Sequence, residues 1–356
     1  MKWPDKISKT LKIEYPIIQA PMLGICTPEM VAAVANGGGL GSLPVGVLPP
    51  ERVLELIRKT KSLTSKPFAV NLFVHDIPDS VDEIEFDTMQ TFLRRICAED
   101  GMIIDEQNAA SLKFNTYKSL IDVLIAENIP IVSFTFGVLD NESIRKLKAN
   151  NTILIGTATC VAEAKILDEK AIDMIVAQGS EAGGHRGSFL NVNDPPLIGS
   201  MTLIPSIAAI TDKPVIASGG ICDGKSISAA FTLGASAVQM GTAFVASHES
   251  LATSVWKKRL IGAGEEDIIL TNSFSGRFAR GIRNKLSEQV TTSGLAVPGY
   301  PIQNSLTTPI RAQAQKTGNT NYIVMLRGQS QAKIEEKGSA EIFLELVRQT
   351  EAQNLS

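Results

Sequence analysis

The segment of this 356-residue sequence best suited to chemistry is a glycine-rich loop, residues 179–187, which follows an apolar run ending at Gln178. It contains His185, one of only 3 histidines in the chain. A histidine in such a loop can act as a general base or position an anion. We therefore predict a functional role for His185 and a structural or solvated role for His75 and His248. Glu181 could pair with Arg186 or with backbone N–H groups, which leaves both structural and catalytic roles open.

Two glycine turns farther along the chain are suited to binding a phosphate group. Gly219-Gly220 and Gly241-Thr242 each end an apolar run, and glycines let backbone N–H groups approach a phosphate closely. Thr242 adds a hydroxyl donor, and Lys225 would add positive charge nearby. These glycines could also serve only as tight turns, but the occurrence of the signal in both turns favours phosphate binding.

Neutral amides at the ends of other apolar runs indicate which kind of phosphate-containing ligand is bound. Asn71 and Gln178 can each donate and accept hydrogen bonds, which suits the pyrimidine edge of a flavin, and Met22 could lie against its ring. Acidic residues are sparse at these run ends, which argues against a divalent-metal enzyme. Because no lysine lies there, a Schiff-base aldolase is also disfavoured. We expect FMN rather than a sugar phosphate, and no metal.

The elements that must position these residues alternate between short apolar runs and amphipathic helices. Eight runs point to a closed (β/α)8 barrel, with an open doubly wound sheet as the main alternative. The first run lacks a G-x-G-x-x-G turn, and the phosphate signals follow the last two runs, where barrels bind phosphate. Thr27 and Pro28 predict a helix start. The eight runs are residues 16–20, 39–44, 67–74, 130–137, 152–158, 174–179, 214–220 and 237–242.

Two excursions interrupt this alternation. Residues 75–115 are acidic and add a helical segment, and residues 248–320 contain Gly, Ser, Thr, Asn and Pro clusters with helical pieces. We predict a barrel domain of residues 1–247 and 321–356, with 248–320 as a smaller, mainly helical cap over its active end. The amphipathic helix at the end of the chain would close the barrel.

Composition excludes several classes of protein. The formal net charge of -3 argues against nucleic acid as the main partner. No apolar run approaches the roughly 18 residues that a membrane span needs, so no membrane association is expected. The four cysteines are far apart, which indicates reduced thiols in a cytoplasmic protein. We expect a small-molecule substrate; a homodimer is a common assembly for barrels, but the sequence does not fix it.

Several motifs together resemble the nitronate monooxygenase family, formerly called 2-nitropropane dioxygenases. The resemblance spans nearly the whole chain and implies a TIM barrel with a cap domain, a non-covalent FMN, and oxidation of alkyl nitronates by O2. The best-known physiological target of the family is propionate 3-nitronate, a toxic anion, which implies a detoxifying role. The motifs are QAPM at 19–22, ANGGGLG at 35–41, VSFTFG at 132–137, QGSEAGGHRG at 178–187 and QMGT at 239–242.

The resemblance also assigns roles to individual residues. His185 matches the active-site histidine, and Ser180 and Tyr300 are assigned to the substrate. Some relatives carry a second histidine where this chain has Thr135, so a two-histidine site is in doubt. The expected cofactor-binding residues are Ala20, Met22, Asn71, Gln178, Gly183, Gly219, Gly220, Gln239, Met240, Gly241 and Thr242.

Two other functions remain open at this point. The chain also resembles the FMN-dependent enoyl-ACP reductases, which use NAD(P)H and an acyl carrier protein. The shared features are the fold, the Glu-Ala-Gly-Gly-His loop and the glycine turns. The motif at 132–137 and the long cap favour the nitronate enzyme. A non-catalytic flavin- or phosphate-binding protein is the remaining alternative, since a fold alone cannot assign function.

Overall fold

The central element of the structure, a computed structural model that describes residues 3–331 and 334–353, is a barrel of eight parallel strands. The strand order is β1-β9-β8-β6-β5-β4-β3-β2, and the bridge between Ile18 and Leu40 joins the two ends of the sheet. This confirms the (β/α)8 prediction. The strands are β1 (Ile17–Gln19), β2 (Gly41–Gly46), β3 (Phe68–Phe73), β4 (Ile131–Thr135), β5 (Ile153–Ala158), β6 (Met174–Gln178), β8 (Val215–Ser218) and β9 (Ala237–Met240).

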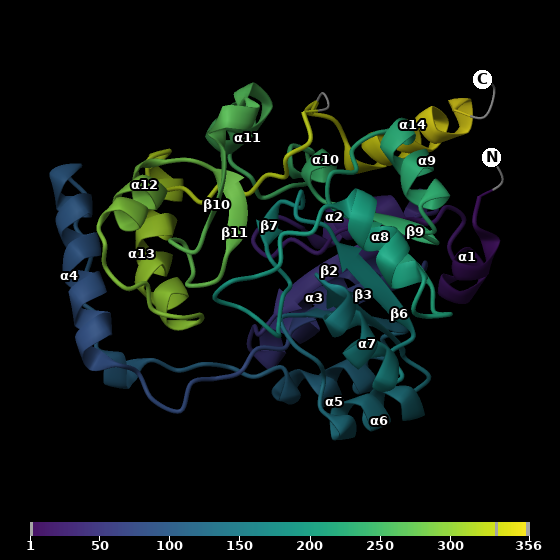
Figure 1. The fold of residues 1–356 in the computed structure, drawn as a ribbon, viewed down its shortest axis with the longest axis horizontal. Helices are drawn as coiled ribbons and strands as arrows, with labels where there is room; N and C mark the ends of the chain where they lie inside the picture. The colour runs from purple at the N-terminus through teal and green to yellow at the C-terminus, as the bar shows by residue number, and fades with distance from the viewer. Residues whose placement is uncertain (1–2, 332–333, 354–356) are drawn as a thin grey trace.

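Helices surround the barrel, as the alternating pattern predicts (Figure 1). The Thr27 hydroxyl accepts from the N–H of Met30 at 3.1 Å, and Pro28 opens the first of these helices, because proline needs no N–H partner there. The surrounding helices are α2 (Pro28–Asn36), α3 (Pro50–Leu63), α5 (Lys118–Ala126), α6 (Asn141–Ala149), α7 (Val161–Glu169), α8 (Ser200–Ala208), α9 (Gly224–Thr232) and the short α10 (Thr242–Val245).

The two ends of the chain complete the barrel. Helix α1 (Asp5–Leu11) places Ile7 and Leu11 in a buried cluster with barrel side chains such as Ile18 and Ile131. Burying each of these two side chains contributes about 1.5–3 kcal/mol. Helix α14 (Ser339–Ala352) packs against α2 and α9, as predicted for the terminal helix. The first and last described segments lie close together, since the Trp3 Nε1 donates to the Glu351 Oε1 at 3.3 Å.

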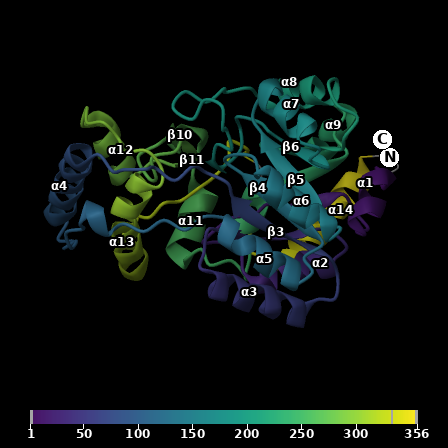
Figure 2. The same ribbon diagram turned by 90° about the horizontal axis from the view of Figure 1, so that it is seen from below.

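A second group of elements lies beside the carboxyl ends of the strands. It contains α11 (Ser254–Gly262), η2 (Glu265–Asp267), β10 (Ile268–Thr271), β11 (Ala279–Ile282), α12 (Lys285–Thr292) and α13 (Ile302–Thr317). Helix α4 (Glu83–Glu99), from the acidic excursion, packs against α13 at its outer edge (Figures 1 and 2). The same excursion also contains the one-turn η1 (Ala109–Ser111).

This group, which we call the cap, is mainly helical but also holds a small antiparallel sheet that the sequence patterns did not indicate. Its order is β10-β11-β7, where β7 is the two-residue strand Gly184–His185 from the loop after β6. Leu326 forms a bridge with Gly281 of β11. The cap sheet therefore takes backbone from the barrel loop and from the segment that follows α13.

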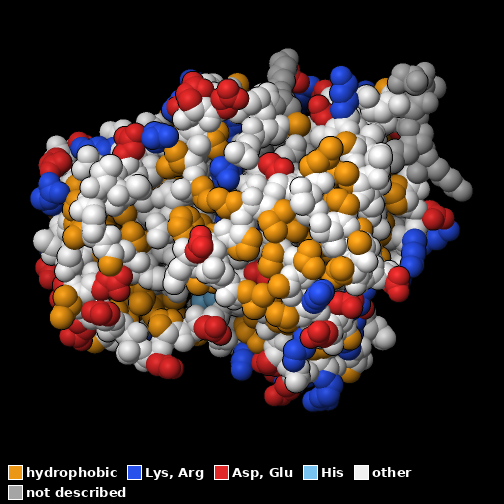
Figure 3. All heavy atoms as spheres, viewed as in Figure 1, with side chains coloured by type: hydrophobic (Ala, Val, Ile, Leu, Met, Phe, Trp, Pro, Cys, Tyr) orange, Lys and Arg blue, Asp and Glu red, His pale blue; other side chains and the backbone are white. Residues whose placement is uncertain are grey.

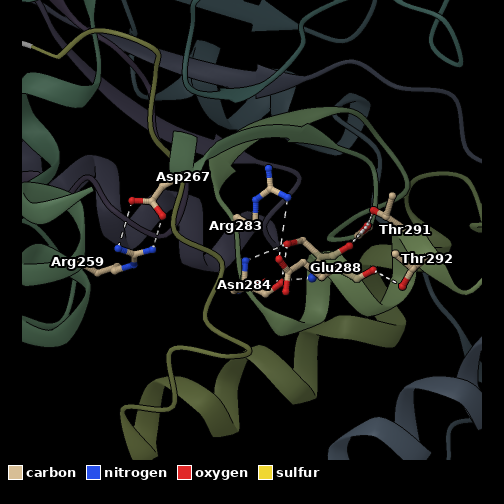
Figure 4. A network of polar contacts seen from close by, with 9 residues as sticks. Arg259, Asp267, Arg283, Asn284, Glu288, Thr291 and Thr292 are labelled. Atoms are coloured by element: carbon tan, nitrogen blue, oxygen red, sulfur yellow. Dashed lines mark hydrogen bonds and ion pairs between the residues drawn. The ribbon is translucent and has the colours of Figure 1, made fainter. Parts of the chain in front are cut away.

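Polar contacts fix the cap internally (Figure 4). Arg259 Nη2 on α11 pairs with the Asp267 carboxylate at 2.8 Å. The Asn284 side chain accepts from the N–H of Ser287 at 3.0 Å and so caps the start of α12. These contacts orient α11 and α12 around β10 and β11.

The surface carries charges of both signs. On the face in Figure 3, Lys and Arg side chains are interspersed with Asp and Glu. Within the described ranges, no helix combines the length and apolar character needed to cross a bilayer. Residues 1–2, 332–333 and 354–356 of the predicted barrel domain lie outside the described part of the chain, and the domain boundaries stay a prediction.

Candidate active site

A cavity of about 480 Å³ lies between the carboxyl ends of the barrel strands and the cap. Most of the predicted site residues come together in its wall, although they are far apart in sequence. Two do not line it: Ser180 and Met240. The predicted residues that do are Ala20, Met22, Asn71, Gln178, Gly183, His185, Gly219, Gly220, Gln239, Gly241, Thr242 and Tyr300.

His185 lies where the barrel loop meets the cap. As part of β7 it pairs with Ala279 of β11, and its ring Nε2 lies 2.7 Å from the Ser275 Oγ. Burial, with the positive charges of Arg277 and Arg311 nearby, lowers the pKa of His185 from 6.5 to about 3. The imidazole is therefore neutral at pH 7, and Nδ1 has no hydrogen-bond partner in the described part of the chain.

Gln178 holds this loop in place. Its Nε2 donates to the carbonyl of His185 at 3.1 Å, and its Oε1 accepts from the N–H of Gly187 at 2.8 Å. The fully buried Arg186 donates to the carbonyls of Gly179 and Gln178 at 2.6 and 3.1 Å. The end of β6 is thus tied to the backbone of His185 and to the two residues that follow it, which orients the imidazole.

Asn71 lies on the neighbouring wall of the barrel. Strand register pairs it with Ser133, and its Nδ2 donates to the Ser133 Oγ at 3.0 Å. The side chain is buried and leaves Oδ1 as an acceptor on the cavity side of β3. Thr135, in the position where some relatives have histidine, also lines the cavity.

The two glycine turns provide backbone donors. Gly219 and Gly220 have φ of +105° and +73°, values that side-chain-bearing residues rarely adopt. Neither N–H donates to an acceptor in the described part of the chain. Thr242 Oγ1 accepts from the N–H of Gly328 at 3.1 Å. Lys225 is exposed and does not line the cavity, so the charge expected from it is not part of this wall.

Glu181 does not line the cavity. Its carboxylate accepts from the N–H of Ser200 at 2.8 Å, which satisfies a free donor at the start of α8. Gly183 packs so closely against Gly328 that a Cβ would overlap the Gly328 backbone. Glu181 and Gly183 therefore shape the loop around His185.

Aromatic side chains close the cap side of the cavity. Tyr300 packs edge-on against His75, with ring centroids 4.6 Å apart, and 5.9 Å from Phe136. His75 is buried behind this wall, and burial lowers its pKa from 6.5 to about 4. His75 is thus not solvated, and its contact with Tyr300 is consistent with the expected structural role. His248 is exposed.

The cap contributes cavity residues that the sequence patterns did not single out. Ser275 lies in the loop between β10 and β11, where no local signal marks it. In α13 a signal exists, because polar residues recur at helical spacing toward the cavity. These residues are Asn304, Thr308, Arg311 and Gln315.

Searching the described residues finds no group of three or more His, Cys, Asp or Glu side chains arranged to hold a metal ion. The cavity wall instead offers amides, hydroxyls, backbone N–H groups, one imidazole and one guanidinium. This donor set suits an organic, anionic ligand.

Comparisons with known proteins identify the family of the chain. The nitronate monooxygenase family matches residues 5–349. A probable nitronate monooxygenase from Staphylococcus aureus strain Newman is 41% identical over 327 residues, which cover 92% of this chain and 91% of that protein. The homologue from strain JH9 is 40% identical over the same coverage.

Solved structures give the same result. A nitroalkane oxidase from Streptomyces ansochromogenes superimposes with a TM-score of 0.89 at 30% identity, covering 98% of this chain and 100% of the other. FabK from Thermotoga maritima superimposes with a TM-score of 0.76 at 27% identity, covering 98% and 97%. Over its barrel, cap and site motifs, the chain thus belongs to the nitronate monooxygenase family, an oxidoreductase family of flavin enzymes.

Proposed function

We propose that this protein uses FMN and O2 to oxidise alkyl nitronates, with propionate 3-nitronate as the substrate and its detoxification as the role. The observation that carries the proposal is a neutral His185 in the wall of a cavity that can hold both a flavin and a small anion. The family match and the relatives named as probable nitronate monooxygenases support it.

The described residues fit FMN. The free N–H groups of Gly219 and Gly220 would bind its phosphate, and Gly241 leaves room beside Met22, whose Sδ would lie 3.4 Å from a Cβ at that position. Asn71 would face the polar edge of the ring system. When bound, FMN supplies the redox chemistry, including the reaction with O2.

His185 has two uses in this reaction, set by its tautomer. If Nε2 donates to Ser275, Nδ1 keeps a lone pair and can take the α-proton of a neutral nitroalkane. If Nε2 accepts from Ser275, the Nδ1–H can donate to a nitronate oxygen. A nitronate has already lost the α-proton, so its oxidation needs only the donor form.

The cap would exclude water from the reacting groups. Tyr300 and Phe136 place aromatic surface on the cap side, which lowers the polarity around the substrate and strengthens its hydrogen bonds. We propose residues 248–320 as this cap domain and Tyr300 as a substrate contact. Ser180 does not line the cavity, and its carbonyl accepts from Arg280 at 2.9 Å, so its proposed part is to position the loop that carries His185.

Oxygen consumption with propionate 3-nitronate, measured beside an NADH-only control, tests the proposal. Consumption well above the control is expected. The likeness to FabK makes an NAD(P)H-dependent enoyl reductase the second candidate. Rapid flavin reduction by NADH, with no oxygen uptake on nitronate, would replace the proposal with that function.

The state of the cysteines bears on the cellular setting of the protein. All four cysteines are free, which is usual for a cytoplasmic protein. We place the protein there and allow a homodimer, which sedimentation of the purified holoprotein would test.

A further inference from the structure

Within the described part of the chain, the cavity wall contains one cationic side chain and no acidic one. Among the described residues that line it, Arg311 is the only Lys or Arg, and none is Asp or Glu. Burial lowers the pKa of Arg311 to about 10, so its guanidinium remains charged at pH 7. The cavity therefore has a net positive wall on its α13 side.

The hydrogen bonds of Arg311 leave this charge uncompensated. Its Nη2 donates to the Asn304 Oδ1 and the Thr308 Oγ1, both at 2.8 Å, and its Nε donates to the Thr307 carbonyl at 3.3 Å. These acceptors are all neutral and belong to the same helix. Nη1 donates to no acceptor in the described part of the chain, and no carboxylate there forms an ion pair with Arg311.

Arg311 is partly buried, and a guanidinium withdrawn from solvent without a counterion is costly unless a ligand supplies one. The buried arginines near the cavity, which are Arg186, Arg277, Arg280 and Arg327, do not line it. Arg277 lies over the Phe136 ring, 4.4 Å from its centroid, and its Nη1 donates to the Ser188 carbonyl. Arg277 does not line the cavity, so Arg311 is left as the cation that a bound molecule can reach.

The position of Arg311 separates it from the proposed phosphate site. The glycine turns that would bind phosphate follow β8 and β9 in the barrel, whereas Arg311 lies on α13 in the cap. Its charge acts on His185 and on Tyr300, the two predicted residues on the reacting side. An anion at Arg311 would therefore belong to the substrate.

We propose that Arg311 determines specificity by binding a carboxylate at the end of the substrate remote from the nitronate group. This deepens the proposed function and rests on it. A guanidinium presents parallel donors to a carboxylate, which gives both affinity and orientation. The cavity would thus favour nitronates with an ω-carboxylate over unsubstituted alkyl nitronates of equal length.

Kinetics with two substrates of matched length test this. For the wild type, we compare kcat/KM for propionate 3-nitronate with kcat/KM for propyl 1-nitronate. Arg311→Met should lower this ratio about tenfold to hundredfold, the usual effect of losing a charged hydrogen bond. Arg311→Lys keeps the charge and should lose less. Arg283→Met, a half-exposed cap residue, is the matched control and should keep the wild-type ratio.

An equilibrium titration gives a readout that needs no turnover. Succinate and butanoate have the shapes of the two nitronates, and their binding is followed by the flavin absorbance of the holoprotein. Wild type should bind succinate more tightly, and Arg311→Met should remove that preference. The titration still tests the role of Arg311 if the protein oxidises no nitronate. Absence of nitronate oxidation would contradict the proposed function but not the carboxylate site.

Three results would overturn the inference. The first is that Arg311→Met changes kcat/KM equally for both nitronates. The second is that Arg311→Met still binds succinate more tightly than butanoate, as the wild type does. The third is loss of FMN from Arg311→Met but not from Arg283→Met, which would assign Arg311 to the phosphate. Should Arg311→Met fail to fold by circular dichroism, Arg311→Lys and Arg311→Gln carry the same comparison.

Discussion

The Nε2 of His185 lies 2.7 Å from the Oγ of Ser275, and this contact joins the barrel to the cap. The two residues are 90 positions apart in the chain. One follows a barrel strand and the other lies between two strands of the cap sheet. The protonation and orientation of the proposed catalytic group therefore depend on cap position.

Replacing His185 should affect the oxidation of neutral nitroalkanes and of nitronates to different extents. We expect His185→Asn to keep FMN but to lose activity with neutral nitroalkanes, since asparagine cannot take the α-proton. Activity with preformed nitronates should fall less, because the amide can still donate a hydrogen bond. Oxygen uptake with nitroethane and with ethyl nitronate measures both, and unchanged turnover of both would remove His185 from the mechanism.

Ser275→Ala should weaken the same step. Losing a neutral hydrogen bond costs about 0.5–1.5 kcal/mol, so nitroalkane turnover should fall about twofold to tenfold. Since Ser275 acts through His185, adding Ser275→Ala to His185→Asn should have little further effect. A double-mutant cycle on oxygen uptake checks this, and additive losses would contradict it.

Two buried histidines should make stability depend on pH. The pKa of His185 is lowered to about 3 and that of His75 to about 4, while both return to about 6.5 on unfolding. Between pH 6.5 and 5 the unfolded chain binds more protons, so the free energy of unfolding falls as pH falls. The slope is up to about 1.4 kcal/mol per pH unit for each histidine.

Urea unfolding at pH 7, 6 and 5 measures this slope. His75→Gln should reduce it, because one of the two groups is then absent. His248→Gln is the matched control, since that side chain is exposed. A slope that is the same in all three proteins would show that the buried histidines do not set it.

The glycine turn after β8 should control cofactor binding. Gly219→Ala would place a Cβ 2.9 Å from the Ala182 N at a φ of +105°, so the turn must shift and the phosphate donors with it. We expect at least a tenfold rise in the FMN dissociation constant. Gly294→Ala is the control, because Gly294 also has a positive φ, +71°, but has open space around it. It should introduce the same kind of backbone strain and leave the FMN dissociation constant unchanged. Equal FMN affinity in both variants would count against the phosphate site.

Much of the site could be predicted because a barrel places strand ends together. Asn71, Gln178, Gly219 and Thr242 each end or follow a buried apolar run, and parallel strands with helical crossovers bring such ends to one rim. The amide of Gln178 shows where prediction from residue type and position stops. Its residue type and position suggested a ligand contact, yet in the structure it bonds to the carbonyl of His185 and the N–H of Gly187.

The contacts across the cap could not be predicted. His185 reads as a loop residue, and only its pairing with Ala279 makes it part of a strand. His75 gave no sign that it supports Tyr300, more than 200 positions away. Such pairs depend on how two separately formed units meet, and local residue patterns carry no record of that.

The barrel, the family and the strand-end residues could be predicted from the sequence alone, because hydrophobic periodicity and glycine turns are local properties that fix local backbone. The charge state and surroundings of the site residues depend on the packed fold. Packing buries His185 near two arginines and so makes it neutral, and it places Arg311 in the wall with no acidic partner among the described residues. Burial and charge depend on neighbours that are distant in the chain, so only the packed cap and barrel could set them.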